Sequence, residues 1–161
     1  MKLPILTSLL AIGMAGTCPA AQPPPTDVVQ YDHVQVDAAF AKAFPLNINS
    51  SYKVICGHRV VPGNVEMHAR DTDIFYIVGG TATFVTGGAI VDQRETKPGT
   101  GEYTGKSISG GTVRHLVKGD VIIIPTMTPH QYTEINGPFD YFVVKVTRPE
   151  AAAPAAPAAG P

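Results

Sequence analysis

The sequence predicts an all-β protein, a small barrel or sandwich of short antiparallel strands with one short helix near its N-terminus. Composition is the first indication, because 16 glycines and 15 prolines in 161 residues favour turns over long helices. The second is a series of eight short apolar runs between residues 52 and 146, most of them separated by glycine or proline. With 44% apolar residues, the chain can build one domain with a sizeable core.

The N-terminus has the anatomy of a secretory signal peptide over residues 1–21. Lys2 supplies a positive charge, and the apolar stretch Leu3–Gly16 is too short to span a bilayer comfortably. Small residues follow, so we expect cleavage after Ala20 or Ala21. Lipidation at Cys18 and an uncleaved anchor are the alternatives. The prediction is an exported protein, periplasmic or secreted, with no membrane attachment once the signal is removed.

A linker and one helix precede the strands. Residues 22–35 begin with a proline run that breaks any helix, and we interpret them as a linker. The helix is predicted over Val36–Phe44, with Asp37 as its N-cap and Pro45 as its stop. The main domain is then residues 36–148. The alanine- and proline-rich tail over residues 149–161 cannot bury a core, so we expect an extended or disordered terminus.

The strands are expected at the apolar runs. Gly79–Gly80, between two such runs, indicates a tight hairpin turn. The polar, glycine-rich segment Asp92–Gly111 is predicted to be a long loop, either a solvated connection or a mobile flap over a pocket. The predicted strands are Tyr52–Val60, Asn64–His68, Asp73–Val78, Thr81–Thr86, Thr112–Val117, Val121–Ile124, His130–Ile135 and Phe139–Val146.

Four candidate metal ligands lie at the ends of predicted strands. Glu66 and His68 are two residues apart, so they share one face of a strand. Asp73 opens the next strand after a turn and can face back toward His68. His130 opens a later strand, and Tyr132 shares its face as a candidate general acid, although a core role is open too. Imidazole and carboxylate ligands suit a divalent ion such as Fe, Mn, Ni or Zn.

Two segments carry a resemblance to the cupin superfamily. The stretch "PGNVEMHARDTDIFYIVGG" (residues 62–80) is similar to the first cupin motif, and "GDVIIIPTMTPHQY" (residues 119–132) is similar to the second. The resemblance spans about residues 52–146. It implies a double-stranded β-helix, or jelly-roll barrel, with a metal ion inside. The matching positions are Gly63, His68, Gly79 or Gly80, Gly119, Asp120, Pro125, Pro129 and His130.

The sequence departs from the cupin pattern at three positions. Glu66 stands where the first motif usually has a histidine, and Asp73 stands where it usually has a glutamate. Met127 replaces the usual glycine of the second motif. The resemblance therefore implies either a site of two histidines and two carboxylates or a triad of Glu66, His68 and His130 with open positions. In the triad, Asp73 orients a histidine instead of binding the metal.

Other polar or reactive residues have weaker indications. Arg59 and His58 have opposite parity on one strand, so only one of them can line a pocket. His115 has no motif behind it and is expected to be exposed. Once the signal peptide is removed, Cys56 is the remaining cysteine and is predicted to be a buried, inert thiol.

Three functions remain open from the sequence. The first is a metal-dependent enzyme with dioxygenase-, lyase- or isomerase-like chemistry on a small organic molecule. The second is a non-catalytic protein that binds a small ligand, and the third is a structural or partner-docking module. A net charge of -1 without a basic cluster argues against a nucleic-acid partner. A homodimer is expected from the resemblance and from exposed sheet edges.

Overall fold

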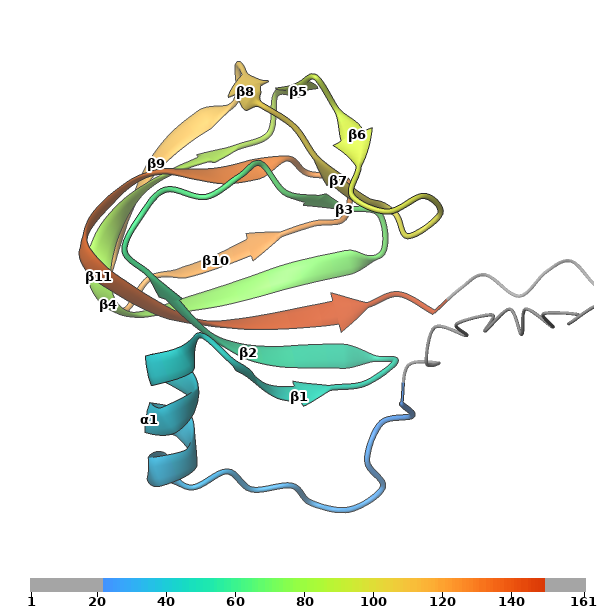
Figure 1. Ribbon diagram of the computed structural model, residues 1–161, viewed down its shortest axis with the longest axis vertical. Helices are drawn as coiled ribbons and strands as arrows, with labels where there is room; N and C mark the ends of the chain where they lie inside the picture. Colours follow the sequence, from blue (N-terminus) through green and yellow to red (C-terminus); the bar gives the residue numbers. More distant parts are fainter. Residues whose placement is uncertain (1–21, 150–161) are drawn as a thin grey trace, which may run out of the picture.

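Two long, bent strands organise the computed structural model, which describes residues 22–149 (Figure 1). These strands, β4 (Asp71–Thr86) and β11 (His130–Thr147), pair with each other in antiparallel fashion along their length. Around them the main sheet has the order β1-β2-β11-β4-β10, and β9 pairs with the far end of β4. The remaining strands of this sheet are β1 (Pro45–Ile48), β2 (Tyr52–Arg59), β9 (Thr112–Val117) and β10 (Val121–Ile124).

Because both long strands bend, their two halves belong to two facing layers. Asp71 to Ile77 pairs with Tyr141 to Thr147, whereas Thr81 to Thr86 pairs with His130 to Asn136. The predicted hairpin at Gly79–Gly80 is therefore wrong: β4 continues through this point and crosses from one layer to the other. Gly80 has a φ of 77°, and a Cβ there would lie 2.2 Å from the carbonyl oxygen of Pro138, so the crossing requires glycine.

The helix α1 (His33–Lys42) begins and ends earlier than the sequence predicts. Asp32, not Asp37, is its N-cap, because the Asp32 carboxylate accepts a hydrogen bond from the backbone N–H of Gln35 and the Gln35 side chain accepts from the N–H of Asp32. Ala43 ends the helix in a left-handed conformation with φ 49°. The helix packs against the layer that contains β2 and the second half of β11, where the ring centres of Phe40 and Phe142 lie 4.9 Å apart.

The core lies between the two layers and is rich in aromatic side chains. Phe84, Phe139 and Ile77 are fully buried, and the centre of the Tyr132 ring lies 4.4 Å from that of Phe84. Burial of one such side chain contributes roughly 1.5–3 kcal/mol. Cys56 is buried and free, as predicted, and burial raises the pKa of its thiol.

Part of the segment predicted as a long loop, Asp92–Gly111, forms three short strands instead. The strands β6 (Arg94–Glu95), β7 (Glu102–Thr104) and β3 (Met67–His68) make one small sheet, and β5 (Ala89–Val91) pairs with β8 (Ser107–Ser109). Thr104 also donates a hydrogen bond of 2.8 Å to the carbonyl oxygen of Val65. This segment is therefore hydrogen-bonded to the strand that carries His68. Its polar sequence did not indicate this pairing.

The terminal predictions lie outside the described residues. These are the signal peptide over residues 1–21, with Cys18, and all of the alanine- and proline-rich tail beyond Pro149. Within residues 22–149, no helix has the length and apolar character needed to cross a bilayer.

Candidate metal centre

Glu66, His68 and His130 come together at one end of the barrel. Each offers one ligand atom, and these atoms all lie within 4.8 Å of one another. Main-chain pairing places them, because Glu66 and His130 exchange two backbone hydrogen bonds of 2.9 Å across an isolated bridge. His68 follows two residues after Glu66, so its side chain emerges on the same side of the chain.

Both imidazoles are held by their Nδ1 atoms. Nδ1 of His130 donates to the carbonyl oxygen of Thr128 at 3.0 Å, and Nδ1 of His68 lies 2.5 Å from a carboxylate oxygen of Glu102. Each of these contacts leaves Nε2 directed at the cluster. Metal-binding histidines commonly have such a carbonyl or carboxylate partner on the other ring nitrogen.

Nε2 of His130 is the clearest sign that the cluster suits a cation. The His130 side chain is 4% exposed, and this nitrogen has no hydrogen-bond partner among the described residues. A buried polar atom without a partner is unusual and costs free energy. Two imidazoles and a carboxylate are the donors that Fe, Mn, Ni or Zn take in proteins, so this donor set fits a divalent ion.

Asp73 lies behind this triad and pairs with a lysine. Lys145 stands directly opposite Asp73 in the pairing of β11 with β4, and its Nζ lies 2.5 Å from Oδ2 of Asp73. The same oxygen lies 3.5 Å from Nε2 of His68 and 3.7 Å from Nε2 of His130. All four predicted ligands therefore converge, but Asp73 has a lysine as its partner.

The positively charged groups of the cluster lower the pKa of its carboxylates. Burial acts to raise the pKa of Glu66, but hydrogen bonding with His68 and the nearby positive charges outweigh it and lower that pKa to about 2. The pKa of Asp73 is lowered as well, because His68 and Lys145 outweigh its burial. Burial lowers the pKa of His130, which keeps its Nε2 lone pair available for a ligand.

The side chains of His68 and Lys145 are in direct contact. Burial acts to lower the pKa of His68, but its hydrogen bonds with Asp73, Glu102 and Glu66 outweigh burial and raise the pKa. Nζ of Lys145 lies 2.7 Å from Nε2 of His68, a distance that leaves room for one proton between the two nitrogens.

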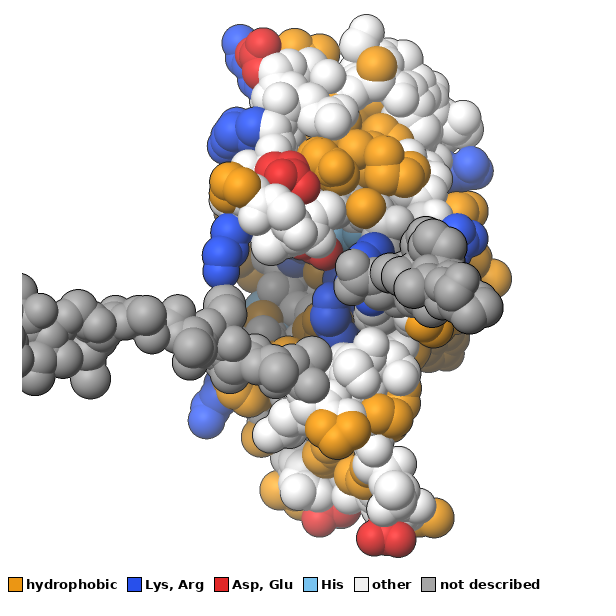
Figure 2. All heavy atoms as spheres, turned by 90° about the vertical axis from the view of Figure 1, so that its right-hand side faces the viewer, with side chains coloured by type: hydrophobic (Ala, Val, Ile, Leu, Met, Phe, Trp, Pro, Cys, Tyr) orange, Lys and Arg blue, Asp and Glu red, His pale blue; other side chains and the backbone are white. Residues whose placement is uncertain are grey.

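A small cavity adjoins the cluster inside the barrel. Its volume is about 140 Å³, and its lining includes Arg59, Glu66, His130, Tyr132 and Lys145 beside apolar side chains. The hydroxyl of Tyr132 is buried without a hydrogen-bond partner among the described residues. This side of the barrel carries β3, the start of β4 and the end of β11 (Figure 1), and Figure 2 shows it hollowed near its middle, with charged side chains around the hollow.

Arg59 fixes a positive charge at this cavity. Its Nε donates to the hydroxyl of Tyr141 at 3.0 Å, one terminal nitrogen lies 3.3 Å from Glu66, and the guanidinium lies 5.1 Å from the centre of the Tyr132 ring. His58, its neighbour, points away and pairs with Asp140 at 2.6 Å. The expectation that one of the two lines a pocket is confirmed, and the residue is Arg59.

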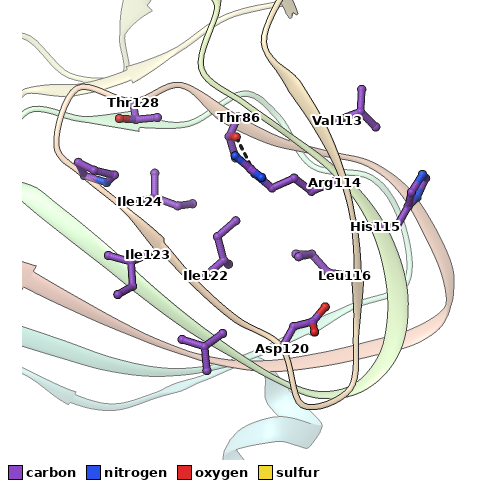
Figure 3. Close-up of a pocket in the computed structure, with 12 residues that line it drawn as sticks. Thr86, Val113, Arg114, His115, Leu116, Asp120, Ile122, Ile123, Ile124 and Thr128 are labelled. Atoms are coloured by element: carbon purple, nitrogen blue, oxygen red, sulfur yellow. Dashed lines mark hydrogen bonds between the residues drawn. The ribbon is translucent and has the colours of Figure 1, made fainter.

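A larger hollow of about 500 Å³ lies elsewhere, between β9 and β10 (Figure 3). Aliphatic side chains such as Leu116, Ile122 and Ile124 line it, and Arg114 donates to the hydroxyl of Thr86 at 3.1 Å. None of the three clustered ligands lines it. The candidate ligands Glu66 and His130 therefore line the smaller cavity and not this hollow.

Two residues that contact His68, Glu102 and Lys145, lie outside the two sequence motifs. Glu102 comes from the segment predicted as a loop and reaches His68 through the pairing of β7 with β3. The sequence does indicate that Lys145 faces inward, because this residue continues the alternation of the buried Tyr141 and Val143 along β11. A lysine at such a position is unusual enough to mark a site.

Known proteins resemble this chain in structure more than in sequence. No protein-family model and no curated protein sequence matches it. Among solved structures, the protein BH2720 from Bacillus halodurans is 13% identical with a TM-score of 0.52, covering 82% of this chain and 89% of that one.

Two further structures are similar over a smaller part. A conserved protein with a double-stranded β-helix domain from Klebsiella pneumoniae is 17% identical with a TM-score of 0.46, covering 65% of this chain and 75% of that one. The DMSP lyase DddQ from Ruegeria pomeroyi is 19% identical with a TM-score of 0.44, covering 65% of this chain. This chain spans 42% of the length of that lyase.

The arrangement of the strands agrees with the likeness to BH2720. Each long strand contributes one half to each of two layers, with β2 and β10 completing one layer and β9 completing the other. The two motifs lie where these strands meet the cluster. The paired strands form a double-stranded β-helix, and this chain shares its fold with BH2720.

Proposed function

We propose that this protein binds one divalent metal ion through Glu66, His68 and His130 and acts on a small organic molecule in the adjoining cavity. One observation carries the proposal: the Nε2 atoms of two buried imidazoles converge with a carboxylate while partners on Nδ1 fix both rings. Fe, Mn, Ni and Zn all accept these donors. With three protein ligands, such an ion keeps positions for substrate and supplies Lewis-acid or dioxygen chemistry.

The cavity favours a small substrate with a polar or anionic group. A volume of about 140 Å³ is well below that of pockets for drug-sized ligands, which begin at roughly 300 Å³. Arg59 supplies a fixed positive charge, and Tyr132 supplies a free hydroxyl. Burial raises the pKa of Tyr132, so at neutral pH this hydroxyl is a hydrogen-bond donor to substrate and not a base. The reaction is dioxygenase-, lyase- or isomerase-like.

A non-catalytic ligand-binding protein is the competing proposal. The position of Lys145 favours it, because this lysine already places a positive charge between Asp73 and His68. In that case the cluster and Arg59 recognise a small anionic ligand without a metal. Metal content decides between the two proposals, and oxygen consumption with phenolic or dicarbonyl compounds then separates a dioxygenase from the lyase and isomerase classes.

The test is elemental analysis of protein purified without a histidine tag. We expect close to one equivalent of a first-row metal in the wild type and a loss of most of it in His130→Ala, with an unchanged circular dichroism spectrum. His115→Ala is the matched control, because His115 is an exposed histidine on β9. A His130→Ala protein that keeps its full metal content would refute the site.

Export and dimer formation are further parts of the proposal. The composition of residues 1–21 supports export to the periplasm or the medium. The edge strand β10 supports a homodimer, since Val121 and Ile123 are 62% and 61% exposed on a strand with a free edge. Sedimentation velocity should give a dimer for the mature wild type and a monomer for Ile123→Lys, whereas a monomeric wild type would refute it.

A further inference from the structure

Lys145 contacts one of the three candidate metal ligands. Its side chain is 13% exposed, and its Nζ contacts Oδ2 of Asp73 at 2.5 Å and Nε2 of His68 at 2.7 Å. Asp73 is also near both imidazoles of the triad. The amino group therefore lies against a buried carboxylate and a candidate ligand nitrogen, which are groups that also attract a metal cation.

The contact with His68 involves the atom that a metal needs. A metal ion binds imidazole through the lone pair of a ring nitrogen, and Nδ1 of His68 is already held by Glu102. Nε2 is the nitrogen left, and Lys145 takes it. While Nε2 is hydrogen-bonded to the lysine, its lone pair is not available to an ion, whichever of the two nitrogens carries the proton between them. The positive charge near Nε2 would also repel an incoming cation.

The geometry points to Lys145 as a built-in competitor of the metal ion. We propose that its amino group closes the site in the metal-free protein and withdraws from His68 when an ion binds, keeping Asp73 as its partner. This inference rests on the proposed metal function, but it makes a separate statement, namely that the chain itself limits the affinity of the site. The small cavity, which Lys145 lines, offers space for the displaced amino group.

Asp73 acquires a role through the same contact. Its Oδ2 is the anchor of Lys145, while its Oδ1 is buried without a hydrogen-bond partner among the described residues. A buried carboxylate with a free oxygen can hold the lysine in either position. Asp73 is thus a positioning residue that keeps the competing cation next to the ligands.

A second lysine offers a matched control. Lys53 on β2 stands opposite Lys145 in the pairing of β2 with β11, and its Nζ lies 2.6 Å from Oδ2 of the buried Asp71. Both lysines therefore pair with a buried aspartate on β4, but the aspartate of Lys53 is two residues away from the one that faces the imidazoles. Replacing Lys53 tests the loss of a buried ion pair without removing the competitor.

The experiment is isothermal titration calorimetry of chelator-treated protein with Zn²⁺ and, separately, Mn²⁺. The variants are Lys145→Met, Lys145→Gln and the control Lys53→Met. We expect Lys145→Met and Lys145→Gln to bind the ion at least about tenfold more tightly than wild type, since a repelling charge and a competing donor are removed. Lys53→Met should bind like wild type. A lysine with a merely structural role would lower metal affinity when replaced, so a gain of affinity is specific to competition.

Thermal unfolding is a second measurement, which tests the inference even if a variant is less stable than wild type. Thermal unfolding without metal should show Lys145→Met less stable than wild type, and added Zn²⁺ should raise its melting temperature by more than it raises that of wild type. Equal or weaker binding by both Lys145 variants overturns the inference while leaving the metal function intact. Binding by the variants but not by wild type refutes the metal function and supports competition. Absence of binding in all proteins refutes both.

Discussion

Glu102 holds His68 in place across 34 residues of sequence, through a contact of 2.5 Å between its carboxylate and Nδ1 of the imidazole. The two residues are paired across β3 and β7, so the backbone fixes their separation. A carboxylate on Nδ1 sets the tautomer and raises the basicity of Nε2, the nitrogen that faces the cluster. The segment over residues 92–111 therefore contributes to the site through its pairing with β3.

Glu102→Ala is expected to weaken metal binding by about 10–100-fold, the usual effect of removing a carboxylate partner of a histidine ligand. Calorimetric titration of the metal-free protein measures this effect. Glu134→Ala is the control, because the carboxylate of Glu134 bonds Thr83 on another part of the sheet. Equal affinity in the Glu102 variant and wild type would show that the tautomer of His68 is set by other contacts.

Short strands bounded by glycine or proline could be predicted from the sequence. The observed bounds of β9 and β10 are those predicted, because short apolar runs there end at glycine or proline. The halves of β4 and β11 were predicted as well, but not their continuity. A bend at Gly79–Gly80 and a turn give the same local pattern, and only the pairing with β11 distinguishes them.

The site was predictable where a motif names a residue and not where pairing supplies one. His68, His130, Glu66 and Asp73 converge, as the two motifs imply. The alternation along β11 indicates that Lys145 faces inward, but only the pairing of β11 with β4 shows that it lies opposite Asp73.

Asp73→Asn is expected to weaken metal binding much less than His68→Ala does. His68 offers a ligand atom within the triad, whereas Asp73 has Lys145 as its closest partner. We expect a change of roughly tenfold or less for Asp73→Asn and a larger loss for His68→Ala, as measured by metal content after dialysis and by titration. If Asp73→Asn loses more metal, Asp73 is a direct ligand and the four-ligand site is correct.

Stability at acid pH should depend on Asp71. Burial acts to raise the pKa of Asp71, but its hydrogen bonds with Lys53 and Thr147 outweigh burial and lower it. A lowered pKa in the folded state means that the unfolded state takes up the proton first as pH falls. The stabilisation is therefore complete above an unfolded pKa of about 3.9 and is lost as pH falls through the folded pKa.

Asp71→Asn should cost roughly 1–3 kcal/mol at pH 7, less than for a fully buried pair because Lys53 is 30% exposed. The difference from wild type should shrink at pH 3. Urea unfolding at both pH values measures it, and Asp92→Asn is the control because Asp92 is exposed. A difference that stays constant with pH would mean that the ion pair is not the cause.

Met127 occupies a position that suits glycine. It has a φ of 59°, in the left-handed region, at the point of the second motif where cupins usually have glycine. Its side chain is 54% exposed, so little packing compensates a backbone cost of roughly 1–2 kcal/mol. Met127→Gly removes this cost but adds flexibility to the unfolded chain worth roughly 0.4–1 kcal/mol, so we expect a net gain of roughly 0.5 kcal/mol in the free energy of unfolding. Met127→Ala keeps the strained backbone and should show no gain. Urea unfolding of the three proteins measures the order, and a Met127→Gly protein no more stable than Met127→Ala would mean that the left-handed conformation at this position carries no strain.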